Sequence, residues 1–251
     1  MNENQFDGKG DIYDKYRPDY PQEFINYIFT NLGADNESVF ADIGSGTGKL
    51  TKQILGNANF VYAVEPNDDM RKISENRLCK YPNFFSINGS AENTTLADNS
   101  IDFITVAQAF HWFNRQSFKN ECHRILKEPG RVIIVWNSYD IESELVLEID
   151  AVNKKYCPNF NGRSNGSYKN IDKDDFSDFF NGEYEIKRFN NPLIFDGQGF
   201  IGRSLSSSYA LKENDENYVK YVEQLKSLFY KYSADGFITI PNTVKSYAGK
   251  I

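Results

Sequence analysis

A glycine-rich turn at residues 41–48, Ala-Asp-Ile-Gly-Ser-Gly-Thr-Gly, constrains the fold of this chain more than any other segment. The apolar run before it predicts a buried strand, and residues 49–55 predict a helix after it. Glycine adopts positive φ angles and has no Cβ, so backbone of this kind can approach a nucleotide-like ligand closely. The spacing is G-x-G-x-G, whereas the dinucleotide fingerprint G-x-G-x-x-G would place its third glycine at Lys49. This difference favours an adenosyl ligand without a pyrophosphate over NAD.

Strands and helices alternate through residues 1–137, which indicates a parallel sheet covered on both faces. Right-handed crossovers in such a sheet place a ligand at the carboxyl ends of the strands. We therefore predict an α/β, doubly wound fold. The predicted strands are residues 39–43, 60–64, 84–87, 101–106 and 131–136, and the predicted helices are residues 20–32, 49–55, 68–80 and 115–126.

The chain changes character after residue 137, where it becomes polar and asparagine-rich. We predict one domain over residues 1–251, because no flexible linker separates the two parts. It comprises a ligand-binding core at 1–137, a cap with one strand at 138–235, and a closing strand and tail at 236–251. The predicted elements are helices at 142–156, 200–210 and 216–232, the last with Val219, Val222, Leu225 and Leu228 on its apolar face, and strands at 183–195 and 237–240.

Composition excludes several classes of protein. The formal net charge is −7 and no basic face is visible, so we expect no nucleic-acid partner. Three scattered cysteines and two histidines predict neither a disulfide framework nor a metal site. The first residues lack the features of a signal peptide, and no run approaches the roughly 18 apolar residues of a membrane span. These features predict a cytoplasmic protein without a membrane partner.

Four segments, in this order, resemble the class I S-adenosylmethionine-dependent methyltransferases, and more narrowly the small-molecule group that includes trans-aconitate methyltransferase. They are residues 13–21 (Tyr-Asp-Lys-Tyr-Arg-Pro-Asp-Tyr-Pro), the glycine turn, 89–92 (Gly-Ser-Ala-Glu) and 107–113 (Ala-Gln-Ala-Phe-His-Trp-Phe). Residues 123–130 resemble the family's helix before strand 5. The resemblance implies a mostly parallel seven-stranded sheet, order 3-2-1-4-5-7-6, with strand 7 antiparallel and a helical cap over the substrate. Residues 183–195 and 237–240 would then be strands 6 and 7.

The resemblance assigns the glycine turn to the methionine part of S-adenosylmethionine. Asp42, with Gly44, Ser45 and Gly46, would bind there, and a carboxylate can accept a hydrogen bond from the cofactor's ammonium group. The alternative is a strand-end turn that only caps the next helix.

Glu65 ends the second strand, 21 residues after Gly44. An acidic side chain at this distance can accept hydrogen bonds from both ribose hydroxyls. Pro66 and Met70 would pack on the adenine, although a lone methionine on a helix is often core filler.

Two further segments are assigned to the cofactor by resemblance. Ser90, Ala91 and Glu92 would reach the adenine, unless Glu92 is a solvated loop charge. Tyr13 and Arg17 would fold over the cofactor, with Arg17 pairing with its carboxylate, unless the segment is only an arm packed by its tyrosines.

The exit from the fourth strand is the predicted place of methyl transfer. Gln108 and Phe110 are candidate cofactor contacts, and Tyr16, His111 and Trp112 are candidate substrate contacts. His111 could deprotonate a hydroxyl or orient a carboxylate, or it could be a hydrogen-bonded turn residue with neither role. The leading hypothesis is therefore methyl transfer to the carboxylate or hydroxyl oxygen of a small molecule.

Two other functions stay open on the sequence: an NAD-dependent oxidoreductase, and a non-catalytic protein that binds S-adenosylmethionine. Asp102 interrupts an apolar strand, and we predict a structural hydrogen bond for it. Arg163 and Arg203 could each attract an acidic substrate or simply lie on the surface.

Overall fold

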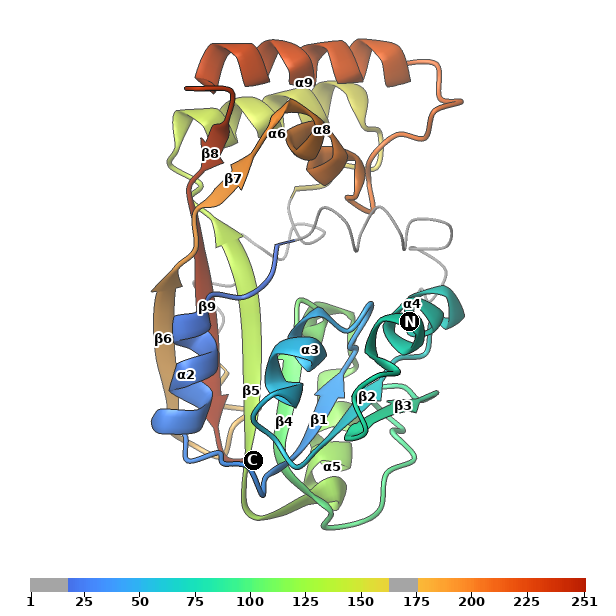
Figure 1. Cartoon of the computed structure of the whole chain (residues 1–251), viewed down its shortest axis with the longest axis vertical. Coiled ribbons are helices and arrows are strands. Elements are labelled where there is room, and N and C mark those ends of the chain that lie inside the picture. The colour runs from blue at the N-terminus through green and yellow to red at the C-terminus, as the bar shows by residue number, and fades with distance from the viewer. Residues whose placement is uncertain (1–17, 163–175) are drawn as a thin grey trace.

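A computed structural model describes residues 18–162 and 176–251 of the chain (Figure 1). A seven-stranded sheet occupies the lower half of the molecule in that view, in the order β3-β2-β1-β4-β5-β9-β6. The strands from β3 to β5 pair in parallel, and β9 pairs antiparallel with both β5 and β6. Its strands are β1 (Val39–Ile43), β2 (Phe60–Val64), β3 (Phe84–Ile87), β4 (Ile101–Ala107), β5 (Leu126–Tyr139), β6 (Tyr184–Asn190) and β9 (Asn242–Gly249).

Helices cover both faces of this sheet, which confirms the predicted doubly wound fold. Side chains alternate between the two faces of a strand. In β5, Ile133 and Val135 therefore join the core beneath α2 and α3, whereas Ile134 and Trp136 join the core beneath α5. The helices around the sheet are α2 (Gln22–Thr30), α3 (Lys49–Leu55), α4 (Asp68–Leu78) and α5 (Arg115–Ile125).

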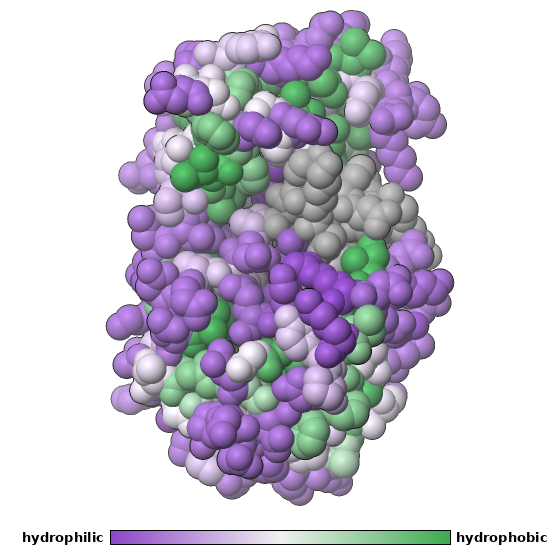
Figure 2. Space-filling model, in the orientation of Figure 1, coloured by the Kyte–Doolittle hydropathy of each residue, from purple (hydrophilic) through white to green (hydrophobic). Residues whose placement is uncertain are grey.

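A cap with its own hydrophobic core forms the upper half of the molecule (Figure 1). It contains a two-stranded antiparallel sheet of β7 and β8. The visible face is largely hydrophilic, with a hydrophobic spot on the left side of the cap (Figure 2). Ile194 of β7 is 63% exposed. The elements of the cap are α6 (Glu144–Tyr156), β7 (Leu193–Phe195), α8 (Gly197–Leu205), α9 (Tyr218–Tyr232) and β8 (Ile238–Ile240).

Three extended segments join the cap to the sheet, and three asparagines tie these segments together. The Asn137 Oδ1 atom, near the end of β5, accepts hydrogen bonds from Asn191 Nδ2 at 2.9 Å and Asn242 Nδ2 at 3.0 Å. Asn191 lies between β6 and β7, and Asn242 begins β9. These hydrogen bonds therefore connect the three segments at the point where the sheet meets the cap.

The prediction of the last strand was wrong. Residues 238–240 form β8 in the cap, and the antiparallel strand of the main sheet is β9. Residues 242–249 read Asn-Thr-Val-Lys-Ser-Tyr-Ala-Gly, without the alternation of a half-buried strand, because β9 is buried on both faces. The predicted strand 183–195 is two strands, interrupted at Pro192, which lacks a backbone N–H.

Several predicted boundaries also move. β5 is longer than predicted, and α8 starts and ends earlier than residues 200–210. The predicted apolar face of α9 was partly wrong, because Val219 is 65% exposed and Tyr221 is buried beside Leu225 and Leu228. Among the described residues, no helix has the length and apolarity required to cross a membrane.

Candidate functional site

The glycine turn after β1 has the left-handed backbone that its sequence predicted. Gly44, Gly46 and Gly48 have φ angles of 68°, 56° and 76°. A Cβ on Gly44 would lie 2.7 Å from the Cβ of Ala109, and one on Gly48 would lie 2.6 Å from Ser74 Oγ. A Cβ on Gly46 would meet no atom of the described residues within 4 Å. Two of the glycines therefore allow close packing within the protein, and the third leaves the turn open to a ligand.

Glu65 lies directly beside this opening. Its Oε2 atom accepts a hydrogen bond from the backbone N–H of Gly46, and its Oε1 atom accepts one from that of Asn67, both at 2.9 Å. Burial raises the pKa of this carboxyl above its usual value. A carboxylate has about four lone-pair sites, so Glu65 can still accept two further hydrogen bonds. The structure thus brings Glu65 to the glycine turn; its contact with a ribose stays a prediction.

Asp42 is wholly buried below the turn. Its Oδ2 atom accepts a hydrogen bond from Thr51 Oγ1 at 2.6 Å, and its Oδ1 atom accepts one from Thr105 Oγ1 at 2.9 Å. Burial raises its pKa to about 6. These bonds join β1 to α3 and β4, so Asp42 holds the base of the turn in this structure. A contact with the cofactor's ammonium group stays a prediction. Sequence reasoning missed both threonines, although Thr105 is a polar residue in an apolar strand.

The turn between β2 and α4 is held from both sides. Asn67 caps α4 by accepting a hydrogen bond from the backbone N–H of Met70 at 3.0 Å. Arg71 Nη1 donates to the carbonyl oxygens of Glu65 and Pro66 at 3.0 and 3.4 Å. Pro66 is half-buried, whereas Met70 is only 4% exposed and fits the core-filler alternative.

The loop between β3 and β4 is anchored to α5. The backbone N–H of Asn114, just before α5, donates to Glu92 Oε1 at 2.9 Å, so Glu92 is not a free loop charge. Ser90 forms a β-bridge with Asn93, and Ala91 is buried. The predicted adenine contact of residues 90–92 is compatible with this anchored loop and stays a prediction.

A second group of bonds, which the sequence did not reveal, holds the same loop. Glu121 Oε1 accepts hydrogen bonds from the Thr94 backbone N–H at 2.8 Å and Thr94 Oγ1 at 2.6 Å. Arg124 donates to both carboxylate oxygens of Glu121, at 2.7 and 2.9 Å, and to the Leu96 carbonyl oxygen at 2.7 Å. Hydrogen bonds from Arg124 and Thr94 lower the pKa of Glu121 to about 2 against the opposing effect of burial.

The exit from β4 holds Gln108 against β5 and buries Phe110 in the core. Gln108 has a positive φ of 60°, and its backbone N–H donates to the Val135 carbonyl oxygen at 3.0 Å. Phe110 is 1% exposed, and its predicted contact with the cofactor stays a prediction. Its ring lies in an aromatic cluster with Phe113, Phe118, Trp136, Phe176 and Phe179.

His111 is half-buried in the short 3-10 helix η1 (Phe110–Trp112). Burial lowers its pKa to about 4, so the imidazole is neutral at physiological pH. Its Nδ1 atom is buried, and among the described residues it has no hydrogen-bond partner. Its ring centroid lies 4.6 Å from that of Trp112.

Three of the predicted site residues, Tyr13, Tyr16 and Arg17, lie outside the described residues. Asp102 makes the predicted structural bonds, accepting from the Val39 N–H and Lys127 Nζ, each at 2.9 Å. Within residues 18–162 and 176–251, no group of three or more His, Cys, Asp or Glu side chains could hold a metal ion.

Comparison with known proteins connects this geometry to a family. Residues 41–134 match a methyltransferase domain family. The chain is 36% identical over 140 residues to an uncharacterized methyltransferase of Mycobacterium tuberculosis, covering 56% of this chain and 55% of the relative. It is 30% identical over 145 residues to an uncharacterized methyltransferase-like protein of Schizosaccharomyces pombe, covering 57% and 56%. The alignments thus span about half the length of these relatives.

The fold has solved counterparts. A candidate type II methyltransferase from Anaeromyxobacter dehalogenans superposes with a TM-score of 0.66 at 17% identity, covering 94% of this chain and 98% of that one. The sequence matches show a methyltransferase domain over residues 41–134, and the strand order is the one that the resemblance to class I S-adenosylmethionine-dependent methyltransferases predicted. Such a domain implies S-adenosylmethionine as its cofactor. The narrower resemblance to the trans-aconitate methyltransferase group stays a prediction.

Proposed function

We propose that this protein transfers a methyl group from S-adenosylmethionine to the carboxylate or hydroxyl oxygen of a small molecule. The observation that carries the proposal is the open backbone at Gly46 beside the partly occupied carboxylate of Glu65. These groups fit an adenosyl ligand, because Gly46 has no side chain that would occupy the space beside the turn. Ribose hydroxyls could then donate to the remaining lone pairs of Glu65.

The residues at the exit from β4 suit this reaction. The bound cofactor supplies an electrophilic methyl group on a sulfonium. The chain must align the acceptor oxygen with that methyl group and exclude water, and alignment of bound reactants contributes a large part of the rate. Gln108 and Trp112 lie on the segment that follows β4, where the acceptor and the methyl group would meet.

The state of His111 favours a carboxylate over a hydroxyl. A general base works best when its pKa lies near the working pH. With a pKa of about 4, His111 is a weak base at neutral pH, whereas a carboxylate acceptor is already ionised and needs none. Neutral His111 can instead donate one hydrogen bond to the acceptor and orient it.

Calorimetric titration tests the cofactor assignment. We expect S-adenosylmethionine and S-adenosylhomocysteine to bind the folded protein and NADH not to bind. Failure of both adenosyl ligands to bind, with folding confirmed by circular dichroism, would refute the proposal. Formation of S-adenosylhomocysteine over a panel of small carboxylic acids and alcohols then tests transfer. Tight binding without turnover across the panel would favour the non-catalytic alternative.

His111→Gln separates an orienting residue from a general base. We expect kcat/KM to fall roughly tenfold, the effect of about one hydrogen bond. We also expect the wild-type rate to show no break near pH 6.5, because His111 stays neutral down to about pH 4. General bases contribute about 10²–10⁴-fold. A loss of that size, with an acid limb near pH 6.5 that only the wild type shows, would contradict the orienting role.

A further inference from the structure

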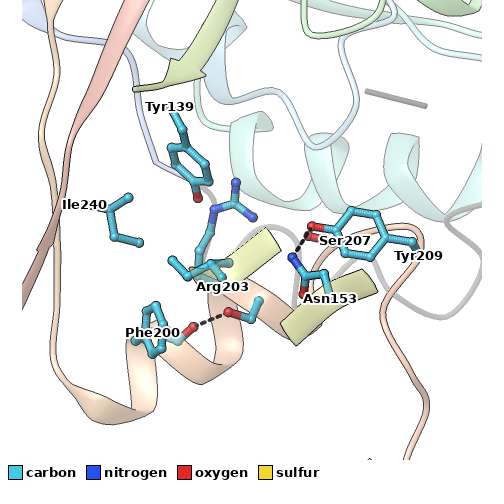
Figure 3. Close-up of a pocket in the computed structure, with 9 residues that line it drawn as sticks. Tyr139, Asn153, Phe200, Arg203, Ser207, Tyr209 and Ile240 are labelled. Carbon is cyan, nitrogen blue, oxygen red and sulfur yellow. Dashed lines mark hydrogen bonds between the residues drawn. The ribbon is translucent and has the colours of Figure 1, made fainter. Parts of the chain in front are cut away.

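The pocket drawn in Figure 3 lies inside the cap, between the end of β5 and the helices α6 and α8. Its volume is about 20 Å³, which leaves room for about one water molecule. Arg203 extends from α8 toward the ring of Tyr139, and its guanidinium carbon lies 5.4 Å from the ring centroid. The pocket is therefore too small for an organic ligand, whereas the open edge of the main sheet is long enough to bind another chain.

β6 is an outer strand of the main sheet and lies at its left side in Figure 1. Within residues 18–162 and 176–251 it pairs only with β9, so no described strand lies along its other edge. Four successive residues of β6 are exposed: Glu185, Ile186, Lys187 and Arg188. Ile186 is 45% exposed. A strand with unpaired backbone groups along one edge can pair with a strand of another chain.

The backbone groups of β6 point alternately toward β9 and toward the open edge. Asn191, just beyond β6, donates its N–H to the carbonyl oxygen of Asn242 at 3.0 Å, and the β6–β9 register places these two residues opposite each other. Hydrogen-bonded and non-hydrogen-bonded pairs alternate along an antiparallel ladder. The N–H and C=O of Ile186 therefore point away from β9 and toward the open edge. The same holds for the backbone of Tyr184 and Arg188.

The exposed charges of β6 are complementary to those of a second β6 in one antiparallel register. With Ile186 opposite Ile186 of a second copy, Glu185 stands opposite Lys187 of that copy, and Lys187 opposite its Glu185. Both side chains lie on the α2 side of the strand: Lys187 Nζ is 6.0 Å from the ring centroid of Tyr27, and burial together with the nearby Glu185 carboxylate raises the pKa of Tyr27.

These two contacts are non-hydrogen-bonded pairs, in which the Cα atoms approach to about 4.5 Å and the side chains lie closest. A pairing centred on either neighbouring residue would instead place Glu185 opposite Glu185, or Lys187 opposite Lys187. Like charges directly opposite are destabilising. Charged residues on an edge strand usually prevent pairing, but those of β6 permit this one register and oppose its neighbours.

We propose that β6 pairs antiparallel with β6 of a second copy of this chain, centred on Ile186, and joins the two sheets into one. Ile186 pairs with its counterpart and Tyr184 pairs with Arg188 on either side, so about six backbone hydrogen bonds cross the contact. A second copy fits better than an unrelated strand, because β6 itself carries both charges at matching positions. The inference does not depend on the proposed function.

Sedimentation equilibrium of the full chain tests the pairing. We expect the wild type to form a dimer at roughly 100 μM protein or below. Glu185→Lys and Lys187→Glu should each raise the dissociation constant about tenfold or more, because each turns both ion pairs into like-charge pairs. A mixture of these two variants should associate as the wild type does, because opposite charges then face each other again in both pairs.

Glu223→Lys and Lys226→Glu are the matched controls, because they reverse exposed charges on α9 of the cap. They should leave the dissociation constant unchanged. Ile186→Pro should abolish the dimer without changing the circular dichroism, because the N–H that it removes points away from β9. If that variant does not fold, the charge variants decide the question.

Two results would overturn the inference. One is a wild type that stays monomeric at about 100 μM. The other is a dimer whose dissociation constant neither charge reversal changes. If both reversals weaken the dimer but their mixture does not associate, the proposed register is wrong.

Discussion

Glu65→Ala should weaken the binding of S-adenosylmethionine by about 3 kcal/mol, or roughly 100-fold, the upper range for hydrogen bonds to a charged group. The substitution removes the acceptor that we assign to the ribose and also releases the Gly46 N–H that this carboxylate holds. Calorimetric titration of the cofactor would measure the change. Glu65→Gln should have a smaller effect, because the amide keeps one acceptor oxygen.

Glu37→Ala provides the control for Glu65, since it removes a carboxylate from an exposed position just before β1. It should not alter cofactor affinity. Unchanged affinity in Glu65→Ala, in a protein with wild-type circular dichroism, would refute the assignment of Glu65 to the cofactor. A loss of folding would show instead that Glu65 mainly holds the glycine turn. The cofactor affinity of Glu65→Gln would then test the assignment.

Glu121→Ala should lower the free energy of unfolding by about 3 kcal/mol, because it leaves Arg124 and the Thr94 N–H without their shared acceptor. Urea unfolding would measure this loss, with exposed Glu128→Ala in the same region as the control. A change below about 1 kcal/mol, the value of an exposed ion pair, would contradict a buried anchoring role.

The pH dependence of stability provides a second test of Glu121. Its pKa is lowered to about 2 in the folded state, so its contribution is complete above the unfolded value near 4.5 and is lost as the pH falls toward 2. His111 affects stability in a different pH range. Because its pKa in the folded state is lowered to about 4, the free energy of unfolding declines as the pH falls from 6.5 to 4. Glu121→Ala should therefore abolish only the loss of stability between about pH 4.5 and pH 2 and should leave the loss between pH 6.5 and pH 4 unchanged.

The sequence predicted those parts of the fold and the site that depend on local pattern. The glycine turn follows from its own residues, and the pairing of Glu65 with that turn follows from adjacent carboxyl ends in a parallel sheet. Asp102 was recognised because a carboxylate inside an apolar strand requires partners. Each of these inferences needed only one segment or two neighbouring strands.

The missed features depend on contacts between distant segments. β9 lacks an alternating pattern, and only its neighbours β5 and β6 explain its burial. Phe110 was assigned to the cofactor from its place at the exit of the fourth strand, and the sequence did not show that its ring packs against α5, β5 and residues 176–179. Thr51 and Thr105 are common residues, and their role exists only because Asp42 lies between them.

The position of β9 has a consequence for biosynthesis. In the main sheet, β6 pairs with β9 and not with β5, so residues 242–249 are inserted between two strands that the ribosome makes earlier. Until they emerge, β5 exposes an unpaired apolar edge, and such edges favour aggregation. β9 must therefore be synthesised before β5 and β6 can be joined in one sheet.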